Sequence, residues 1–342
     1  MQNTNFLKID VVIPAYNASK YIAETLQSVL TQTLLPNKVI VVDDGSTDNT
    51  LDVVNGIDSN IIEVISVENG GVSRARNIGI RASTADYIAF LDADDLWHED
   101  KLKAQAEALI ASPESKAVYS YAIMCDENGV PTTKAPSYKN VPYPPGKLTE
   151  KLLFEFINLS GSASSVMVES KILKSTDLFD EDMSYAEDID LWVRLSLIAD
   201  YSLVPKDHVI IRVNTSSATR SLSWDSKKKM ISDHFYFMDK YARDYEIPKE
   251  TVRISLTLMA RPFIKRPHKI IEYFYFCDHL KKRAPYYFQE VSVDGGAIKL
   301  FWVSCFSIAV RIYNRLQLVG RLRLLFSERT IFFSKSKKNP RF

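Results

Sequence analysis

Two groups of acidic residues in this sequence have a spacing that could support metal binding or catalysis. The first, Asp92-Ala93-Asp94, directly follows the apolar run 87–91, which is typical of a buried strand. Carboxylates at the C-terminal end of such a strand lie where open α/β sheets bind ligands. Two carboxylates separated by one small residue suit a hard divalent cation that also takes phosphate oxygens as ligands. A solvated acidic turn has the same pattern, so the triplet alone does not decide between the two.

The second group is Glu187-Asp188. The spacing of Leu191, Leu195 and Ile198 predicts a helix, so the two acids lie at or near its N-terminus. Acidic side chains there interact favourably with the helix dipole. Helix capping alone therefore accounts for them, and a catalytic role needs further evidence.

The hydrophobic pattern predicts the elements that position these acids. Strands are expected at 8–14, 38–42, 61–67 and 87–91, with helices between them. This spacing is typical of successive βαβ units and predicts a mostly parallel sheet. One edge of that sheet carries three turns, Pro14-Ala15-Tyr16, Asp43-Asp44 and Asp92-Ala93-Asp94. We expect Pro14 to end the first strand and Asn17 or Ser19 to cap the helix that follows.

The rest of the chain continues this pattern and then changes to a helical one. We predict a helix at 101–111, a long proline-rich loop at 131–146, and further strands at 117–124, 162–169 and 209–213. From residue 226 onward the spacing of apolar residues is helical. The sequence therefore predicts an α/β domain over residues 1–225 and a helical, basic region over residues 226–342.

Two arginines stand at an unusual position. Arg74 and Arg76 lie in the first turn of the helix predicted after Gly71, where the helix dipole disfavours cations. An anion bound at this helix end would explain them. Pairing with Asp92 or Glu68, or exposure to solvent, explains them equally well.

The charge of the chain is nearly balanced overall but unevenly distributed. The formal net charge of +1 gives no general nucleic-acid-binding surface. From Ala297 onward, however, there are ten basic residues and one acidic residue. A basic amphipathic helix with Trp302 and Phe306 can bind an anionic membrane surface. A pair of helices packed on the catalytic domain or on another subunit is the alternative.

The cysteines and the apolar runs indicate the cellular compartment in which the protein is expected. Three cysteines without metal-ligand spacing favour a reducing environment. Neither a signal sequence nor an apolar run of membrane-spanning length is found. We therefore expect a cytoplasmic protein, peripheral on the inner face of the cell membrane if the basic tail binds lipid.

Five segments together resemble, in order and spacing, the family 2 glycosyltransferases of the GT-A fold. They are residues 11–17, 41–48, 71–79, 90–95 and 187–188. The resemblance covers roughly residues 8–215 and is specific, because several independent motifs coincide. It implies a Rossmann-like GT-A domain that moves a sugar, with inversion, from a nucleoside diphosphate to an acceptor hydroxyl with the help of Mn²⁺ or Mg²⁺.

The resemblance also implies roles on the donor side. Tyr16 would stack on the nucleoside base, and Asp44 would accept the imide N–H of uracil, although guanine and thymine offer a similar group. Asp43 would support the turn. Asp94, with Asp92, would hold the metal. The other residues implied to border the donor are Pro14, Ala15, Asn17, Arg76, Asn77 and Ala93.

On the acceptor side, Asp188 matches the family's general base, which must act from the face opposite the leaving group. Glu187 would orient it or contact the acceptor. Trp192 would either stack on a sugar or belong to the core of the domain. The chain departs from the family at Asn214, where many relatives carry a metal-binding His; this implies weaker metal binding or a water ligand.

We therefore expect a metal-dependent hexosyl- or N-acetylhexosaminyltransferase that uses a UDP-sugar and glycosylates a glycolipid or a polysaccharide of the cell surface. A sugar nucleotidyltransferase would need a glycine-rich loop after the first strand, which is missing. A catalytically inactive scaffold would be signalled by loss of Asp94 or Asp188, and both are present. The transferred sugar, the acceptor, the linkage and the oligomeric state do not follow from the sequence.

Overall fold

The computed structural model describes residues 7–126, 130–132, 148–154, 159–213, 224–241, 244, 279–285 and 287. The chain divides into two compact units, Met1–Thr251 and Val252–Phe342, and most described residues belong to the first. The predicted loop at 131–146 is described only at its first two residues, and Asn214 and the basic tail 297–342 lie outside the described residues. The two-domain division at residue 225 stays a prediction.

The first unit is built on an eight-stranded sheet in the order β3-β2-β1-β4-β7-β6-β8-β5. Neighbours among β1 to β4 are parallel, whereas β7 is antiparallel to both β4 and β6. Strand β8 is parallel to β6 and antiparallel to β5. This mostly parallel sheet confirms the predicted fold class. The strands are β1 (Ile9–Ala15), β2 (Lys38–Asp44), β3 (Ile62–Val67), β4 (Tyr87–Phe90), β5 (Leu96–Trp97), β6 (Ser115–Asp126), β7 (Val166–Glu169) and β8 (Asp200–Val213).

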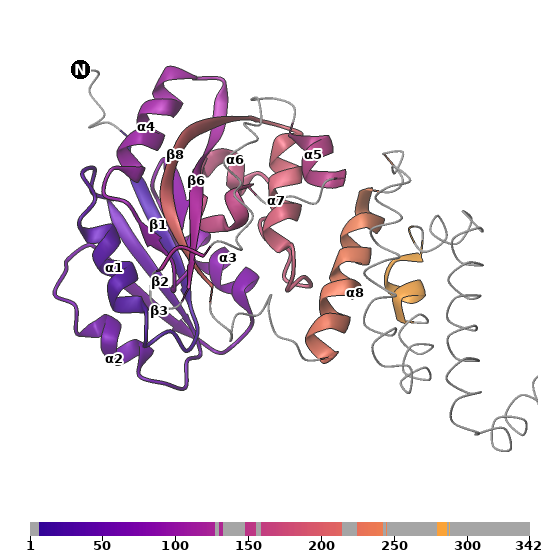
Figure 1. Cartoon of the computed structure of the whole chain (residues 1–342), viewed down its shortest axis with the longest axis horizontal. Helices are drawn as coiled ribbons and strands as arrows, with labels where there is room; N and C mark the ends of the chain where they lie inside the picture. The colour runs from indigo at the N-terminus through magenta and orange to yellow at the C-terminus, as the bar shows by residue number, and fades with distance from the viewer. Residues whose placement is uncertain are drawn as a thin grey trace, which may run out of the picture. The chain divides into compact units, whose positions relative to one another are not determined.

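Helices cover both faces of the sheet. The helices of the first unit are α1 (Ile22–Leu30), α2 (Thr50–Asn55), α3 (Val72–Ala82), α4 (Lys101–Ala111), α5 (Thr149–Phe154), α6 (Ser170–Lys174), α7 (Glu187–Ser196) and α8 (Trp224–Tyr241). Figure 1 shows α1, α2 and α4 on one side of the sheet and α3 and α6 on the other.

The alternation of side chains along the central strands produces these two layers. Val39 and Val41 of β2 belong to the core shared with α1 and α4, while Ile40 and Val42 pack with Ala75 of α3. Both faces of the strand are thus buried, which explains its unbroken apolar sequence.

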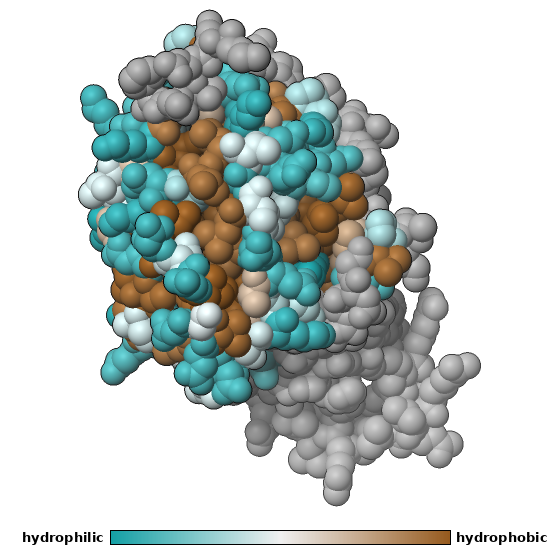
Figure 2. Space-filling model, turned by 90° about the vertical axis from the view of Figure 1, so that its left-hand side faces the viewer, coloured by the Kyte–Doolittle hydropathy of each residue, from teal (hydrophilic) through white to brown (hydrophobic). Residues whose placement is uncertain are grey.

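The outer side of the α1, α2 and α4 layer is mixed in character. Figure 2 shows this side with hydrophobic residues in an irregular band between hydrophilic ones. Helix α1 illustrates the cause, because Ile22 and Leu26 are buried while Glu24 is exposed. Helix α1 thus buries one face only.

Two local predictions are wrong. Pro14 does not end the first strand, since it lies inside β1 and pairs with Val42 of β2. The pairing of β1 with β4 ends at Val12. The missing N–H of Pro14 therefore removes no hydrogen bond between β1 and β4. Neither Asn17 nor Ser19 caps α1, whose N-cap is Tyr21.

Two later strands differ from prediction in length. The predicted strand 162–169 begins as a 3-10 turn, Ala163–Ser165, and only Val166–Glu169 is extended. In contrast, the last strand begins at Asp200 rather than at residue 209. Within the described part of the chain, no helix combines the length and apolar character needed to cross a membrane.

Candidate active site

The turn after β2 is organised by two adjacent carboxylates. Asp44 is buried and accepts hydrogen bonds from the backbone N–H groups of Gly70 and Gly71, both at 2.8 Å. Asp43 accepts from the N–H of Ser46 at 3.3 Å and from the hydroxyl of Ser66 at 3.1 Å, in agreement with its expected role in the turn. Each oxygen of Asp44 keeps a second lone pair for another donor.

The end of β1 is joined to this turn by Asn17. Its side-chain oxygen accepts from the N–H of Thr47 at 2.8 Å, and its own N–H donates to the hydroxyl of Ser46 at 2.9 Å. Its φ of 49° is left-handed, a conformation that asparagine tolerates better than most residues. The neighbouring Tyr16 is 52% exposed, so its ring is available for stacking, whereas Pro14 and Ala15 are buried within β1.

Asp92 lies just beyond β4 and is held from three directions. Its backbone N–H donates to the Ser164 hydroxyl at 2.9 Å. One carboxylate oxygen accepts from Arg76 Nη2 at 2.7 Å and the other from the Ser162 hydroxyl at 3.0 Å. The side chain is still 28% exposed. Sequence reasoning missed both serines because it assigned them to a strand, in which their hydroxyls carry no signal of this contact.

The next two acids have different environments. Asp94 is half-buried, while Asp95 is buried and accepts from the Ser164 hydroxyl at 2.6 Å and from the N–H of Arg212 at 3.1 Å. Burial, reinforced by the charges of Asp94 and Asp92, raises the pKa of the Asp95 carboxyl well above its usual value. Asp95 is therefore a structural anchor for the turn, whereas the side chains of Asp92 and Asp94 are only partly buried.

Arg212 ties this turn to two other elements. It lies in β8, its Nη1 donates to the backbone oxygen of Asp94 at 3.2 Å, and its Nη2 is paired with Glu24 of α1. Its guanidinium also lies 5.1 Å from the ring centre of Tyr21. Sequence reasoning assigned no role to Arg212, because its partners are separated from it by more than a hundred positions.

Arg76 joins the two acidic groups. Its Nη2 is 2.7 Å from Asp92 and its Nη1 is 2.9 Å from Glu187, and its side chain is only 4% exposed. Burial opposes the charge, but Asp92, Glu187 and Asp188 raise the pKa of Arg76 above its usual value. Acids from the end of β4 and from the start of α7 therefore surround a single guanidinium.

For Arg76, the structure shows the pairing alternative. Arg76 pairs with Asp92, as one alternative held, and also with Glu187. Arg74 donates to the backbone oxygen of Glu68 at 3.0 Å. An anion is not needed to explain either side chain.

Helix α7 begins at Glu187, as the sequence predicted. The preceding residue, Ala186, has a left-handed φ of 62°, and Glu187 and Asp188 are both buried. One oxygen of Asp188 accepts from the N–H of Ile189 at 2.8 Å. Asp188 thus satisfies one N–H at the helix end, while Glu187 pairs with Arg76.

Two predicted binding residues have other contacts. Trp192 is fully buried and packs 6.0 Å from Phe90 and 6.2 Å from Phe179 between ring centres, so it belongs to the core and offers no face to a sugar. Asn77 is also buried; its amide nitrogen donates to the oxygen of Phe179 at 2.9 Å and its oxygen accepts from the same residue's N–H at 2.9 Å. Asn77 therefore supports the segment before α7 rather than a donor pocket.

The carboxylates can accommodate a cation only together with a ligand. Within the described residues, no group of three His, Cys, Asp or Glu side chains is arranged to hold a metal. His208 is buried, with its ring 3.3 Å from the Ser120 hydroxyl and 3.3 Å from Asp100, and it belongs to no such group. Ions such as Mg²⁺ need only one or two carboxylates when substrate phosphates complete the shell, and Asp92 with Asp94 fit that donor set.

Comparison with known proteins agrees with this geometry. Residues 10–166 match the model of glycosyl transferase family 2. An uncharacterized glycosyltransferase of Rickettsia typhi, RT0329, is 29% identical over 228 residues, which are 65% of this chain and 70% of that protein. TuaG of Bacillus subtilis, named "Putative teichuronic acid biosynthesis glycosyltransferase", is 38% identical over 129 residues, or 37% of this chain. The chain spans about half the length of TuaG, 51%.

A solved structure shares the fold. The crystal structure of S. aureus TarS 1–349 in complex with UDP-GlcNAc superposes with a TM-score of 0.61 at 19% identity, over 84% of this chain and 83% of that one. At this identity the likeness concerns the fold. The fold, the motif positions and the matched family model lead to one conclusion: residues 10–166 of this chain are a family 2 glycosyltransferase domain.

Proposed function

We propose that this protein is an inverting glycosyltransferase that moves a sugar, in the hexose or N-acetylhexosamine class, from a UDP-sugar to a saccharide hydroxyl. The observation that carries the proposal is the pair of contacts made by Arg76, to Asp92 at 2.7 Å and to Glu187 at 2.9 Å. They bring the acids predicted for the donor and those predicted for the acceptor to one place, although 95 positions separate Asp92 from Glu187 in the sequence.

The donor side has groups suited to a nucleoside diphosphate. Tyr16 presents an exposed ring beside the Asp43–Asp44 turn, and the free lone pairs of Asp44 suit the imide N–H of a uracil. The complex of TarS with UDP-GlcNAc supports a UDP-sugar as the donor. When bound to Asp94 and Asp92, Mn²⁺ or Mg²⁺ would neutralise the charge of the leaving diphosphate.

The transfer itself requires a base on the acceptor. The acceptor oxygen forms a bond to the anomeric carbon while the bond from that carbon to the diphosphate oxygen breaks. The acceptor proton passes to the Asp188 carboxylate, and Glu187, fixed by Arg76, keeps the helix end in place beside it. Because attack occurs opposite the leaving group, the configuration at the anomeric carbon is inverted.

A variant at Asp94 tests the donor and metal assignment. In Asp94→Ala, we expect the Mn²⁺-dependent thermal stabilisation by a UDP-sugar to fall by at least about 1.4 kcal/mol, a tenfold weaker affinity. The measurement is a thermal-shift titration with a panel of nucleotide sugars, with and without Mn²⁺. Asp58→Ala, at a surface acid outside the site, is the matched control. Equal stabilisation of the wild type and Asp94→Ala would contradict the assignment.

The acceptor is proposed to be a glycolipid or a growing surface polysaccharide. The name of TuaG supports polysaccharide biosynthesis, and the ten basic residues from Ala297 onward support an anionic membrane surface. Deleting residues 297–342 is expected to abolish sedimentation with vesicles that contain anionic lipid, and to lower transfer to a lipid-linked acceptor. Full transfer to a lipid-linked acceptor by the truncated protein would argue against the role of the tail.

A further inference from the structure

Helix α8 contacts the segment that leads into α7. Asp233, fully buried in α8, accepts two hydrogen bonds from Ser184, one from its N–H and one from its hydroxyl, both at 3.0 Å. Ser184 lies three residues before Glu187. A residue of α8 therefore fixes the backbone just before the acidic pair.

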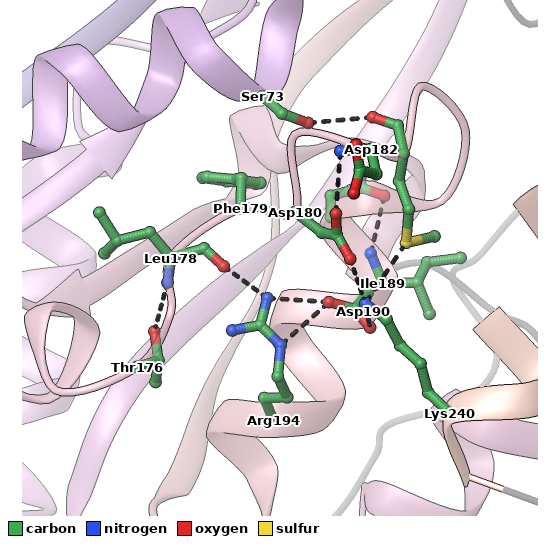
Figure 3. A network of polar contacts seen from close by, with 12 residues as sticks. Ser73, Thr176, Leu178, Phe179, Asp180, Asp182, Ile189, Asp190, Arg194 and Lys240 are labelled. Atoms are coloured by element: carbon green, nitrogen blue, oxygen red, sulfur yellow. Dashed lines mark hydrogen bonds and ion pairs between the residues drawn. The ribbon is translucent and has the colours of Figure 1, made fainter. Parts of the chain in front are cut away.

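A second contact lies further along α8. Lys240 Nζ is paired with Asp180 and lies 3.0 Å from Asp190 Oδ1, as Figure 3 shows. Asp190 is fully buried and also accepts from Arg194 Nε at 2.9 Å and from the Tyr241 hydroxyl at 3.1 Å. One ammonium group thus holds two acids that are ten positions apart.

The contact of Lys240 with these two acids matters because of where Asp180 and Asp190 lie in the chain. Asp180 and Asp190 lie on either side of residues 181–189, which include Glu187 and Asp188. By binding both, Lys240 holds the two ends of this segment together. The turn within it contains Ala186 at a φ of 62°, a conformation that costs free energy and persists only when its surroundings impose it.

The charges of this cluster support a lasting contact. Burial disfavours the charge of Lys240, yet Asp190 and Asp180 raise its pKa above the usual value. Burial likewise disfavours the charge of Asp180, yet the hydrogen bond from Lys240 lowers its pKa. Both groups are therefore charged at neutral pH, and neither is easily lost from the pair.

We propose that Lys240 is a positioning residue, which fixes the first turn of α7 so that the Asp188 carboxylate meets the acceptor hydroxyl in the reactive geometry. This inference rests on the proposed function. Lys240 acts through Asp180 and Asp190 and is not assigned a contact with substrate. The rate of an enzyme falls steeply when a catalytic group is misplaced, by about 100-fold for a shift of 1 Å.

The test compares Lys240→Met with Lys240→Arg and with a control on the same helix, Lys228→Met. Lys228 pairs with Asp225 at the surface, 2.7 Å away, outside the 180–190 region. For Lys240→Met we expect kcat to fall by about 10- to 100-fold, with the Kd for the UDP-sugar changed by less than about twofold. Lys240→Arg, which can bind both acids, should recover most of the lost turnover, and Lys228→Met should behave as the wild type.

Hydrogen exchange provides a readout that does not depend on activity. In Lys240→Met, the amides of residues 184–190 should exchange about tenfold faster or more, while those of β1 to β4 keep their protection. Unchanged exchange in 184–190, or an equal loss of protection throughout the sheet together with weaker donor binding, would overturn the inference. If the wild type transferred no sugar at all, the proposed function would fail, and the exchange data would still decide whether Lys240 holds this segment.

Discussion

In Asp188→Asn, the turnover number is expected to fall by about 100- to 10,000-fold, the range that a general base contributes. Asparagine has the same shape and can still accept the hydrogen bond that the N–H of Ile189 donates to Asp188, but it cannot take a proton from the acceptor. The start of α7 and the ion pair between Arg76 and Glu187 should therefore persist. The loss is expected in kcat, because the donor contacts lie on other elements.

The measurement combines single-turnover transfer with donor titration. The Kd of the UDP-sugar should change by less than about twofold, and the free energy of unfolding by less than about 1 kcal/mol, as for most isosteric changes at one hydrogen bond. Asp182→Asn, at an exposed acid in the same segment, is the matched control and should retain full activity. Near-normal turnover in Asp188→Asn would exclude Asp188 as the base.

The sheet was predictable because its signals are local. Buried parallel strands carry unbroken apolar runs, and the acids at the end of β2 and just after β4 mark where those runs stop. The distinction between Asp43 and Asp44 came from the family resemblance and not from a local pattern. The error at Pro14 is local as well, and it arises because β1 extends beyond its pairing with β4. Asn17 does not cap α1 because its side-chain oxygen accepts from the N–H of Thr47 instead.

The contacts of the site were less predictable because they join distant positions. The helical pattern around Trp192 predicts a helix but does not show how deeply this side chain is buried. Only its packing against Phe90 and Phe179 places it in the core. Among the three acids that follow β4, composition does not tell which is buried; the hydroxyl of Ser164 and the N–H of Arg212 decide that it is Asp95.

Arg76→Met is expected to lower the free energy of unfolding by about 3 to 5 kcal/mol, the cost of removing one partner from a buried ion pair. The guanidinium is buried against two acids, and Glu187 at 11% side-chain exposure loses more than Asp92 at 28%, because water can solvate Asp92. Methionine fills much of the same volume, so the loss reports on charge rather than on a cavity. Urea unfolding measures this change directly.

Two further variants define what Arg76 contributes. Arg76→Lys keeps the charge but replaces the two separate nitrogens that bond Asp92 and Glu187 with one, so an intermediate loss is expected. Arg81→Met removes an exposed pair on the same helix, 4.0 Å from Glu181 and 60% exposed, and should cost less than about 1 kcal/mol. If Arg76→Met were as stable as Arg81→Met, the acids of β4 and α7 would not depend on this guanidinium, and the geometry that supports a shared donor and acceptor site would lose its physical basis.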